Sequence, residues 1–372
     1  MKFECNRSEL LEALSNVTRA ASSKSTLKVI EGILFEARPD GVHLCCYNLD
    51  MSISKTVSAD VQETGILVMP IRLYDIVRRL PAERVLINCR DLIVHIESGP
   101  TAFDIEAMPP EEFPEIPAIE SDHTIEVPQC RLRTMISQTA HAISTKQDKP
   151  VYTGALFEVH TNELHMVTLD GYRVAIRIEP IAPSEQYEFI VPGKTLSEIG
   201  KMLGESDDMV VIDIGKHNIF FCIDGYNIVS RLMVGKFVNY QTFIHEGGSV
   251  MRVKTSSLLA GVERMALVIS EANRSPVRCV FGNNRVRLSC ETPVGRAEDE
   301  FPCEADFPDV VIGFNNKYLV DCFKSVECDE IRLVVENGRM PVQVLPPEGD
   351  HFLFLLLPIM LNENANKEKT DE

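Results

Sequence analysis

The 372-residue sequence contains no tryptophan, no C-x-x-C pair and no long apolar run. Its 11 cysteines are scattered, with Cys45 and Cys46 adjacent, so neither a disulfide framework nor a cysteine zinc site is expected. The longest apolar run, HFLFLLLPIML, is shorter than the roughly 18 residues that suggest a membrane span. The opening MKFECNRSEL is charged at once and does not fit a secretory signal. These features predict a globular cytoplasmic protein without a metal or a cofactor.

Catalytic signatures are missing as well. The sequence has no P-loop, no Gly-x-Gly-x-x-Gly segment and no ordered Ser, His and Asp set around its nine histidines. The segment TLDGYR places Asp170 near Arg173, but after a strand it is interpreted more simply as a turn with a surface Arg. An enzyme is therefore disfavoured, and the function is expected to lie in binding.

A short helix pattern occurs three times at an interval of 123 residues. LYDIVRRL at 73–80, LSEIGKML at 196–203 and LVDCFKSV at 319–326 have apolar, acidic and basic residues at matching places. The longer segments SELLEALSNVTRAAS, CRLRTMISQTAHAIS and SSLLAGVERMALVIS align in the same order, at 8–22, 130–144 and 256–270. This period is domain-sized and far above the roughly 20–50 residues of solenoid repeats, so three copies of one domain are predicted.

The expected domain boundaries follow from this period. Domain 1 covers 1–122 and ends in the Pro-rich, acidic linker MPPEEFPEIPAIESDHT. Domain 2 covers 123–247, domain 3 covers 248–361, and the polar tail 362–372 is expected to be disordered. Alternating segments such as DMVVIDIG predict strands, with turns at Asp224-Gly225 and Asn337-Gly338. Each copy is therefore predicted to be an α+β unit with two helices on an antiparallel sheet.

The net charge of −18 argues against a nucleic-acid partner until its distribution is considered. The two helices of each copy, with their flanks, hold 17 Lys and Arg against 8 Asp and Glu, a balance of +9 that leaves −27 for the other residues. These segments are 7–24, 70–80, 130–149, 192–203, 254–274 and 314–326. Any one of them fits a solvated helix face, but the same sign in all six favours a basic surface.

Such a surface suits the phosphates of a nucleic-acid duplex. Distributed Lys and Arg bind phosphate backbones without contacting bases. Aromatic residues make up only 7% of the chain, which disfavours the stacking platforms that bind single strands. A duplex held without sequence preference is therefore the expected nucleic acid.

Taken together, these landmarks resemble the bacterial DNA sliding clamps, the beta subunits of replicative DNA polymerases. The segments that carry the resemblance include VMPIRLYDIVRRLP, EEFPEIP, TLDGYRVA, FIVPGKTLSEIGKML, GKFVNY, IGFNNKYLVD and LLLPIML, and it covers 1–361. It implies a head-to-tail homodimer, a six-domain ring whose helices surround duplex DNA. It also implies a non-catalytic subunit that tethers the polymerase and binds the clamp loader and other clamp-motif proteins of replication and repair.

The resemblance carries three sets of residues over to this chain. DNA-facing positions correspond to Lys24, Arg72, Arg78, Lys146, Lys149, Lys194 and Lys201, and the third copy of the repeated helix adds Lys317 and Lys324. The partner-peptide cleft corresponds to Tyr152, Leu169, Gly171, Tyr172, Arg173, Val174, Val238, Phe243, Pro341, Leu355, Leu357, Pro358, Ile359 and Met360. The subunit interface corresponds to Phe103 and Ile105 against Val268 and Ile269.

Two features of the cleft depart from the family pattern. The family often has Thr-Asp-Gly-His-Arg where this chain has Leu169-Asp170-Gly171-Tyr172-Arg173, and Val238 replaces a Pro. The chain also continues 11 residues past the usual end. The alternative function is a three-domain protein scaffold that does not encircle DNA. It would account for the repeats and the cleft, but it leaves the six basic helices without a role.

Overall fold

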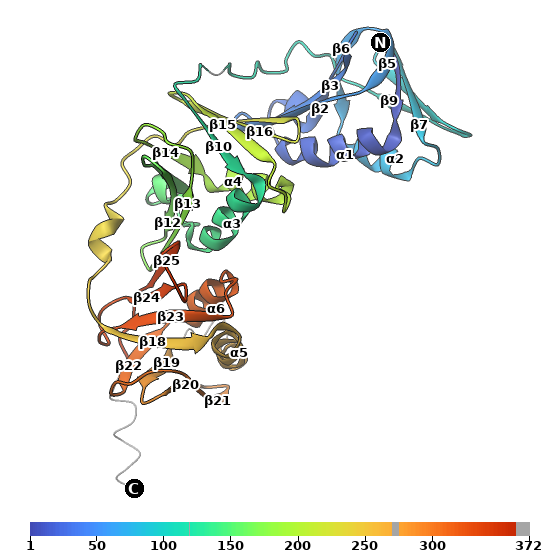
Figure 1. Ribbon diagram of the computed structural model, residues 1–372. Coiled ribbons are helices and arrows are strands. Elements are labelled where there is room, and N and C mark those ends of the chain that lie inside the picture. The colour runs from blue at the N-terminus through green and yellow to red at the C-terminus, as the bar shows by residue number, and fades with distance from the viewer. Residues whose placement is uncertain (119, 270–274, 362–372) are drawn as a thin grey trace. The chain divides into compact units, whose positions relative to one another are not determined.

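The computed structural model describes residues 1–118, 120–269 and 275–361 (Figure 1). The predicted tail 362–372 lies outside the described residues. The chain forms two compact units, and each is described by itself. Unit 1 contains residues 1–132 and 194–233, and unit 2 contains 133–193 and 234–372. No helix in the described part of the chain is long and apolar enough to cross a membrane.

Six α-helices occur in the described residues, two in each predicted domain. They are α1 (Arg7–Val17), α2 (Arg72–Arg79), α3 (Gln129–Thr139), α4 (Gly193–Met202), α5 (Thr255–Ala266) and α6 (Asn316–Lys324). The repeated pattern forms α2, α4 and α6, as predicted. In α2 the apolar stripe Leu73, Ile76 and Val77 is buried, while Arg78 and Arg79 are exposed.

The longer helices end earlier than the sequence predicts. α1 ends at Val17 and passes into a 3₁₀ turn, η1 (Thr18–Ala20); α3 ends at Thr139 before a similar turn, η3 (Ala140–Ala142). The hydroxyl of Thr18 donates to the Leu14 carbonyl, and that of Thr139 to the Met135 carbonyl, each at 2.7 Å. Threonines that bond to the preceding turn in this way compete with the regular helix ladder, which fits the tightening seen here.

The strands of unit 1 form two antiparallel sheets. The five-stranded sheet has the order β5-β1-β7-β8-β9, and the eight-stranded sheet has the order β10-β15-β16-β17-β4-β3-β2-β6. The bounds of the first are β1 (Lys2–Asn6), β5 (Ala59–Glu63), β7 (Arg84–Arg90), β8 (Ile93–Ser98) and β9 (Thr101–Glu106). Those of the second are β2 (Gly32–Arg38), β3 (Gly41–Tyr47), β4 (Met51–Val57), β6 (Gly65–Pro70), β10 (His123–Pro128), β15 (Met209–Ile214), β16 (Asn218–Ile223) and β17 (Tyr226–Arg231).

Unit 2 also contains two antiparallel sheets. Their orders are β14-β11-β12-β13-β25-β24-β23-β18 and β21-β20-β19-β22. The first comprises β11 (Gly154–Val159), β12 (Glu163–Leu169), β13 (Arg173–Pro180), β14 (Tyr187–Pro192), β18 (Ser249–Lys254), β23 (Glu330–Val335), β24 (Val342–Leu345) and β25 (Phe352–Leu356). The second comprises β19 (Val277–Gly282), β20 (Arg285–Thr292), β21 (Gly295–Pro302) and β22 (Val310–Phe314).

Each eight-stranded sheet joins strands of two predicted domains. In unit 1 the join is β17 on β4, with Ile228 opposite Ile53. In unit 2 it is β25 on β13, with Phe354 opposite Ala175. The β9 and β21 edges have no such partner within the described residues. The middle domain thus gives four strands to each unit, and the backbone ladders run without a break from one predicted domain into the next.

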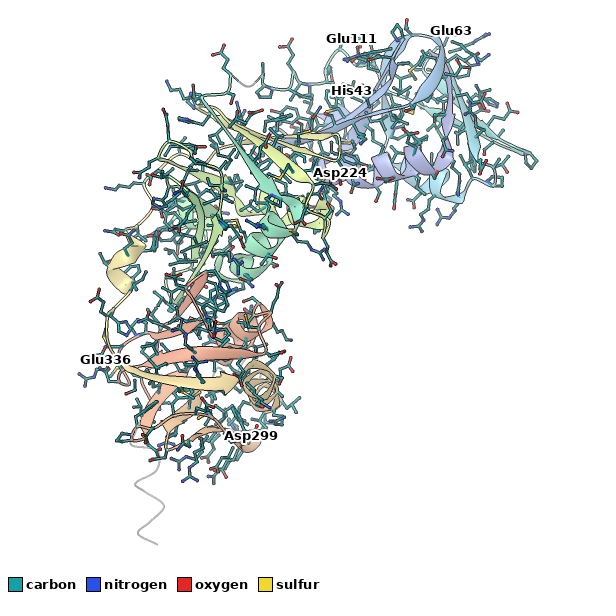
Figure 2. The ribbon with its side chains drawn as sticks, in the orientation of Figure 1. His43, Glu63, Glu111, Asp224, Asp299 and Glu336 are labelled. Carbon is teal, nitrogen blue, oxygen red and sulfur yellow. The ribbon has the colours of Figure 1, made fainter. Side chains whose placement is uncertain are left out.

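Two connecting segments show how the sequence sets these elements. Asp224 (φ 49°) and Gly225 (φ 76°) form the predicted tight turn between β16 and β17 (Figure 2). The linker after domain 1 is anchored at its start, because the Met108 and Val68 backbones bond to each other. Phe113 packs with Met108 against a small apolar cluster. Its Pro-rich composition therefore marks a connection that is attached to domain 1 over its first residues.

Candidate partner cleft and nucleic-acid interface

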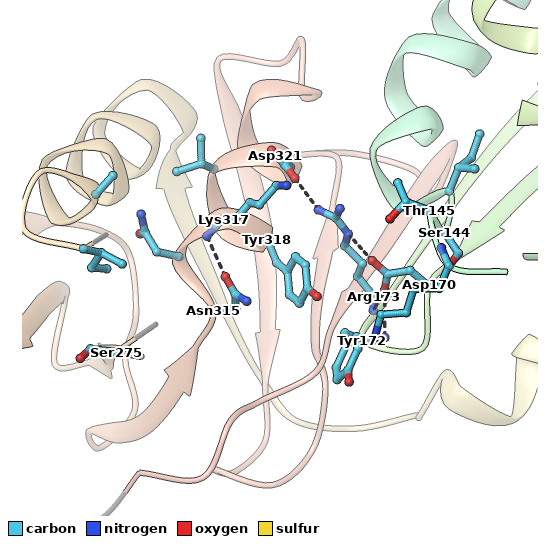
Figure 3. A pocket seen from close by; sticks show the side chains of 16 residues that line it. Ser144, Thr145, Asp170, Tyr172, Arg173, Ser275, Asn315, Lys317, Tyr318 and Asp321 are labelled. Carbon is cyan, nitrogen blue, oxygen red and sulfur yellow. Dashed lines mark hydrogen bonds and ion pairs between the residues drawn. The ribbon is translucent and has the colours of Figure 1, made fainter. Parts of the chain in front are cut away.

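Unit 2 contains a cavity of about 610 Å³ beside the turn between β12 and β13 (Figure 3). Its walls come from that turn, from the loop after η3, from the end of α5 and from the start of α6. Lys146 and Lys317 line it, as do Tyr172 and Tyr318. The cavity therefore combines flat aromatic faces with positive charge.

The β12–β13 turn presents Tyr172 to this cavity. Asp170 accepts hydrogen bonds from the backbone N–H groups of Tyr172 (2.9 Å) and Arg173 (3.2 Å), which fixes the turn. Gly171 has a φ of +89°, a conformation that disfavours any other residue. The Tyr172 side chain is consequently held outward, 49% exposed, and its ring stacks on that of Tyr318 with centroids 5.8 Å apart.

Arg173 joins the turn to α6. Its Nε donates to Asp170 Oδ2 at 3.0 Å, and its Nη1 donates to Asp321 Oδ2 at 2.9 Å (Figure 3). The guanidinium also lies 4.5 Å from the centre of the Tyr318 ring. Arg173 is 6% exposed, so the interpretation of a surface Arg was wrong. Two carboxylates and an aromatic face compensate its burial, and one carboxylate comes from a distant helix.

A neutral histidine lies beside this ion-pair network. His141 in η3 packs edge-on against Phe354 of β25, with ring centroids 5.3 Å apart. Burial, and secondarily the nearby Arg173 charge, lower the pKa of His141 to about 4. The imidazole is therefore uncharged at neutral pH and packs as an apolar ring against the last strand of the chain.

After β25, the C-terminal apolar run LLLPIML bonds first to the turn before β13 and then to β22. The Leu357 N–H donates to the Tyr172 carbonyl at 3.0 Å, and the Ile359 N–H donates to the Gly313 carbonyl at 2.7 Å. A Cβ on Gly313 would lie 2.6 Å from the Ile359 carbonyl oxygen, so only glycine permits this approach. Met360 remains 85% exposed. The run is thus fixed by its backbone and leaves an apolar side chain in solvent.

Of the remaining residues predicted for the cleft, some are buried in the sheet and the others lie on connecting segments. Leu169, Val174 and Leu355 are buried within the sheet, where they support the turn from below. Tyr152 packs edge-on against Phe237 at 5.5 Å, next to Val238, and Phe243 is 41% exposed at the end of η5 (Tyr240–Phe243). Pro341 directly precedes β24, the neighbour of β25.

The sequence prediction missed the α6 contribution to this site. Tyr318 stacks on Tyr172, Lys317 lines the cavity, and Asn315 caps α6 by accepting from the Lys317 N–H at 3.0 Å. All three lie in the segment IGFNNKYLVD, which carried part of the resemblance. The signal was therefore present, but the repeat pattern assigned these residues to a basic helix rather than to a cleft.

The predicted DNA-facing side chains are all exposed. They are Lys24, Arg72, Arg78, Lys146, Lys149, Lys194, Lys201, Lys317 and Lys324. Arg78, Lys201 and Lys324 occupy the same slot of α2, α4 and α6. Two of them have acidic neighbours: Lys201 Nζ lies 2.7 Å from Glu198, and Lys324 Nζ lies 2.9 Å from Glu263. The two lysine side chains are 51% and 56% exposed, and ion pairs of such exposed cations are weak and leave them able to exchange partners.

Two of these lysines also touch the predicted cleft. Lys146 Nζ lies 5.6 Å from the centre of the Tyr172 ring, and Lys149 Nζ lies 5.3 Å from that of Tyr152. Cation–π contacts at exposed sites contribute about 0.5–1 kcal/mol, too little to commit a side chain to one role. The sequence separates a DNA set from a cleft set, whereas the folded unit 2 places members of both side by side.

The predicted subunit-contact residues differ in exposure. Phe103 on β9 is 39% exposed. The residues at the same place in the other two domains, Ile228 on β17 and Phe354 on β25, point to the same side of their sheets and are fully buried. Val268 and Ile269 follow the end of α5, pack against the hydrophobic core of unit 2 and are partly buried. Leu267, which the prediction omitted, is 83% exposed.

Comparisons with known proteins agree with the resemblance found in the sequence. Models of the N-terminal, central and C-terminal domains of the DNA polymerase III beta subunit match residues 1–117, 126–239 and 242–360. The chain is 27% identical to the beta sliding clamp of Staphylococcus epidermidis, over 96% of this chain and 99% of that protein.

Solved structures are similar over the same extent. The DNA polymerase sliding clamp from Bacillus subtilis matches with a TM-score of 0.93 and 26% identity, covering 97% of this chain and 100% of that one. The DNA polymerase III subunit beta from Pseudomonas aeruginosa, bound to griselimycin, matches with a TM-score of 0.91 and 26% identity over the same shares.

Proposed function

Because the chain belongs to the DNA polymerase III beta-subunit family, whose members are sliding clamps and non-catalytic processivity subunits, we propose that two copies close head to tail around duplex DNA. The ring tethers the polymerase, and its partners dock in the cleft of unit 2. The observation that carries this proposal is the threefold repeat of a helix with a basic residue in the same exposed slot.

The two sheet edges support the head-to-tail closure. In the repeat, β9 is equivalent to β17 and β25, and β21 is equivalent to β4 and β13. Within the chain, β17 pairs with β4 and β25 pairs with β13, each across a domain boundary. Pairing β9 of one copy with β21 of the next completes the third joint by the same antiparallel ladder, and covers two edges that would otherwise expose unpaired backbone groups.

The same equivalence sets a register for this joint. Ile228 lies opposite Ile53 at the first domain boundary. Counted from the equivalent hairpin turns, Phe103 corresponds to Ile228 and Ala297 corresponds to Ile53, so Phe103 would lie opposite Ala297. Phe103 would then be covered in the dimer as Ile228 is within unit 1. The next pair, on the opposite face of the sheet, is Asp104 opposite Arg296, which are oppositely charged.

Binding to DNA is expected to be weak per contact and independent of sequence. The basic side chains are exposed and spread over several helices, so they suit phosphates rather than base edges. Salt screens such contacts strongly, with affinity falling as counterions compete. Persistence on DNA must therefore come from closure of the ring.

A retention experiment tests the ring. We expect the protein, once assembled on a nicked circular plasmid with a clamp loader, to elute with the plasmid through gel filtration in moderate salt. Cutting the plasmid once should release it, because a ring leaves a linear duplex by sliding off its end. Gel filtration before and after the cut measures both states. Equal loss from circular and linear DNA would contradict encirclement and favour the scaffold alternative.

The cleft is proposed to bind short peptides with a Gln followed by Leu and then Phe or Leu. Apolar anchors would enter between the Tyr172–Tyr318 pair and the C-terminal run. Modest affinity, with Kd around micromolar, is expected of a site with so few anchors. The lysines at its margin would favour acidic residues next to the motif.

Two truncations test the position of the cleft. A chain ending at Leu361 should bind a fluorescent clamp-motif peptide as the full chain does. A chain ending at Pro358 loses the Ile359–Gly313 bond and the exposed Met360, and should bind about tenfold more weakly or worse, since roughly 1–3 kcal/mol of apolar contact is removed. Fluorescence anisotropy gives both affinities. Loss of binding on removal of 362–372 alone would place the site elsewhere.

A further inference from the structure

A cluster of potential metal ligands lies on the β11–β12 hairpin of unit 2. Glu158, His160 and His165 each offer a ligand atom, and these atoms lie within 4.8 Å of one another. Glu158 and His165 are direct cross-strand partners, and His160 follows the end of β11. The two imidazole rings have centroids 4.4 Å apart. The backbone of one hairpin thus brings together two nitrogens and a carboxylate.

The surroundings of the cluster suit a bound ion. The side chains of Glu158 and His165 are 18% and 17% exposed, and that of His160 is 39% exposed, so an ion could reach all three from solvent. Glu163 Oε2 lies 3.0 Å from His165 Nε2. The Tyr240 hydroxyl donates to Glu158 Oε2 at 2.5 Å. Hydrogen bonds of this kind orient metal-binding carboxylates and sharpen their geometry.

The repeats of this chain provide an internal comparison. The equivalent cross-strand pair in domain 1 is Glu36 and His43, but Arg38 occupies the place of His160 and donates to Glu36 at 2.5 Å. In domain 3 the equivalent pair is Val280 and Arg287. An arginine cannot bind a metal and neutralises the neighbouring carboxylate. Of the three copies, the middle one alone has two imidazoles beside an acid.

We propose that Glu158, His160 and His165 bind a divalent transition-metal ion, with Zn²⁺ as the best fit. Two imidazoles and one carboxylate are a common zinc donor set, and Glu163 or a water would complete a tetrahedron. Cysteine spacing does not reveal this site, because its ligands are histidines and a glutamate that come together only when the hairpin forms. The site goes beyond the proposed clamp function.

The ion would act on the segment that carries part of the cleft. Tyr240 begins η5, close in sequence to Val238 and Phe243. Its bond to Glu158 attaches this connection between domains 2 and 3 to the hairpin. A metal that fixes Glu158 would therefore hold Tyr240 in place and restrict the connecting segment.

Calorimetric titration of the full-length protein with Zn²⁺ tests the site. We expect one ion per chain at this cluster, and His160→Gln or His165→Gln should weaken its binding at least tenfold. His43→Gln is the matched control, because it alters the equivalent residue of domain 1 (Figure 2), and it should bind as the unaltered protein does. Absorption of the Co²⁺ form distinguishes nitrogen and oxygen ligands from the thiolates of the 11 cysteines.

A gain-of-function variant gives an independent check. Arg38→His places a second imidazole in domain 1 and should raise the number of bound ions from one to two per chain. The proposal is overturned if the unaltered protein binds no Zn²⁺ at this cluster, or if His160→Gln and His165→Gln both bind as well as it does. It is also overturned if His43→Gln lowers binding as much as they do. Circular dichroism of each variant verifies that the fold is retained.

Discussion

Replacing Phe103 by Asp is expected to convert the proposed dimer into monomers without unfolding the chain. In the proposed register this side chain is covered by the partner subunit's β21, and a carboxylate there would lose water without gaining a partner. A buried unpaired charge costs about 3 kcal/mol, or roughly a 100-fold change in affinity per joint. The proposed closed ring contains two such joints, so the penalty would count twice. Sedimentation velocity over a range of concentrations measures the shift.

Ile66→Asp is the matched control for this variant. Ile66 is 47% exposed on β6, which is also an edge strand of a unit 1 sheet, but it has no place in the proposed joint. This control variant should sediment as the unaltered protein does. Dimers that persist in Phe103→Asp at low concentration, or monomers in both variants, would contradict the assignment of β9.

A charge swap tests the register itself. Asp104→Arg and Arg296→Asp should each weaken the dimer, since like charges then lie directly opposite each other. The double variant should recover most of the loss. If the double variant is weaker than either single one, the two side chains are not partners and the register is wrong. Leu267→Glu extends the test to the end of α5, which is 83% exposed at this residue.

Replacing Arg173 by Met is expected to destabilise unit 2 by about 3 kcal/mol. The change leaves Asp170 and Asp321 without their shared guanidinium, and removing one partner of a buried ion pair typically costs about 3–5 kcal/mol. The lower end applies because the Asp321 side chain is 31% exposed and partly hydrated. Differential scanning calorimetry should show a lower melting temperature. Peptide binding should weaken as well, because Tyr318 loses the guanidinium that lies on its ring.

An exposed ion pair of domain 1 provides the comparison. Arg79 pairs with Asp75 in α2 at 3.6 Å, and Asp75 occupies the slot that Asp321 has in α6. Both side chains are more than half exposed, so Arg79→Met should leave the melting temperature almost unchanged. Adding Asp321→Asn to Arg173→Met should restore part of the stability, because it removes one uncompensated charge. If Arg173→Met melts as the unaltered protein does, the network is not what joins β13 to α6.

Local patterns in the sequence were enough to predict the three helix pairs and their buried stripes. The spacing of Leu73, Ile76 and Val77 selects one helix face, and an interval of 123 residues repeats that face twice. The residues at which α1 and α3 end could not be predicted from these patterns. They depend on hydroxyl groups that bond to the preceding turn, and a threonine in an apolar pattern does not reveal whether it will do so.

The site was predictable where its partners are close in sequence. Asp170 and Arg173 are three residues apart, and an Asx turn with Gly171 follows from residue types alone. The burial of Arg173 was not predictable, since its second carboxylate, Asp321, lies 148 residues away. Leu267 was missed for a related reason. An apolar triplet after a helix does not show which members turn to the core, and here Val268 and Ile269 do.

In the proposed assembly, the unequal edges β9 and β21 have a consequence for how copies of the chain would associate. A molecule that pairs one edge with a different edge of its neighbour is a bifunctional monomer, as in a linear polymerisation, and pairing alone does not end its growth. Ring size is then decided by the angle between the two edges: a half-turn per chain closes after two copies, whereas another rotation would give larger rings or helical filaments. Substitutions that change this angle, even far from either edge, would therefore alter the size of the assembly while leaving each joint intact.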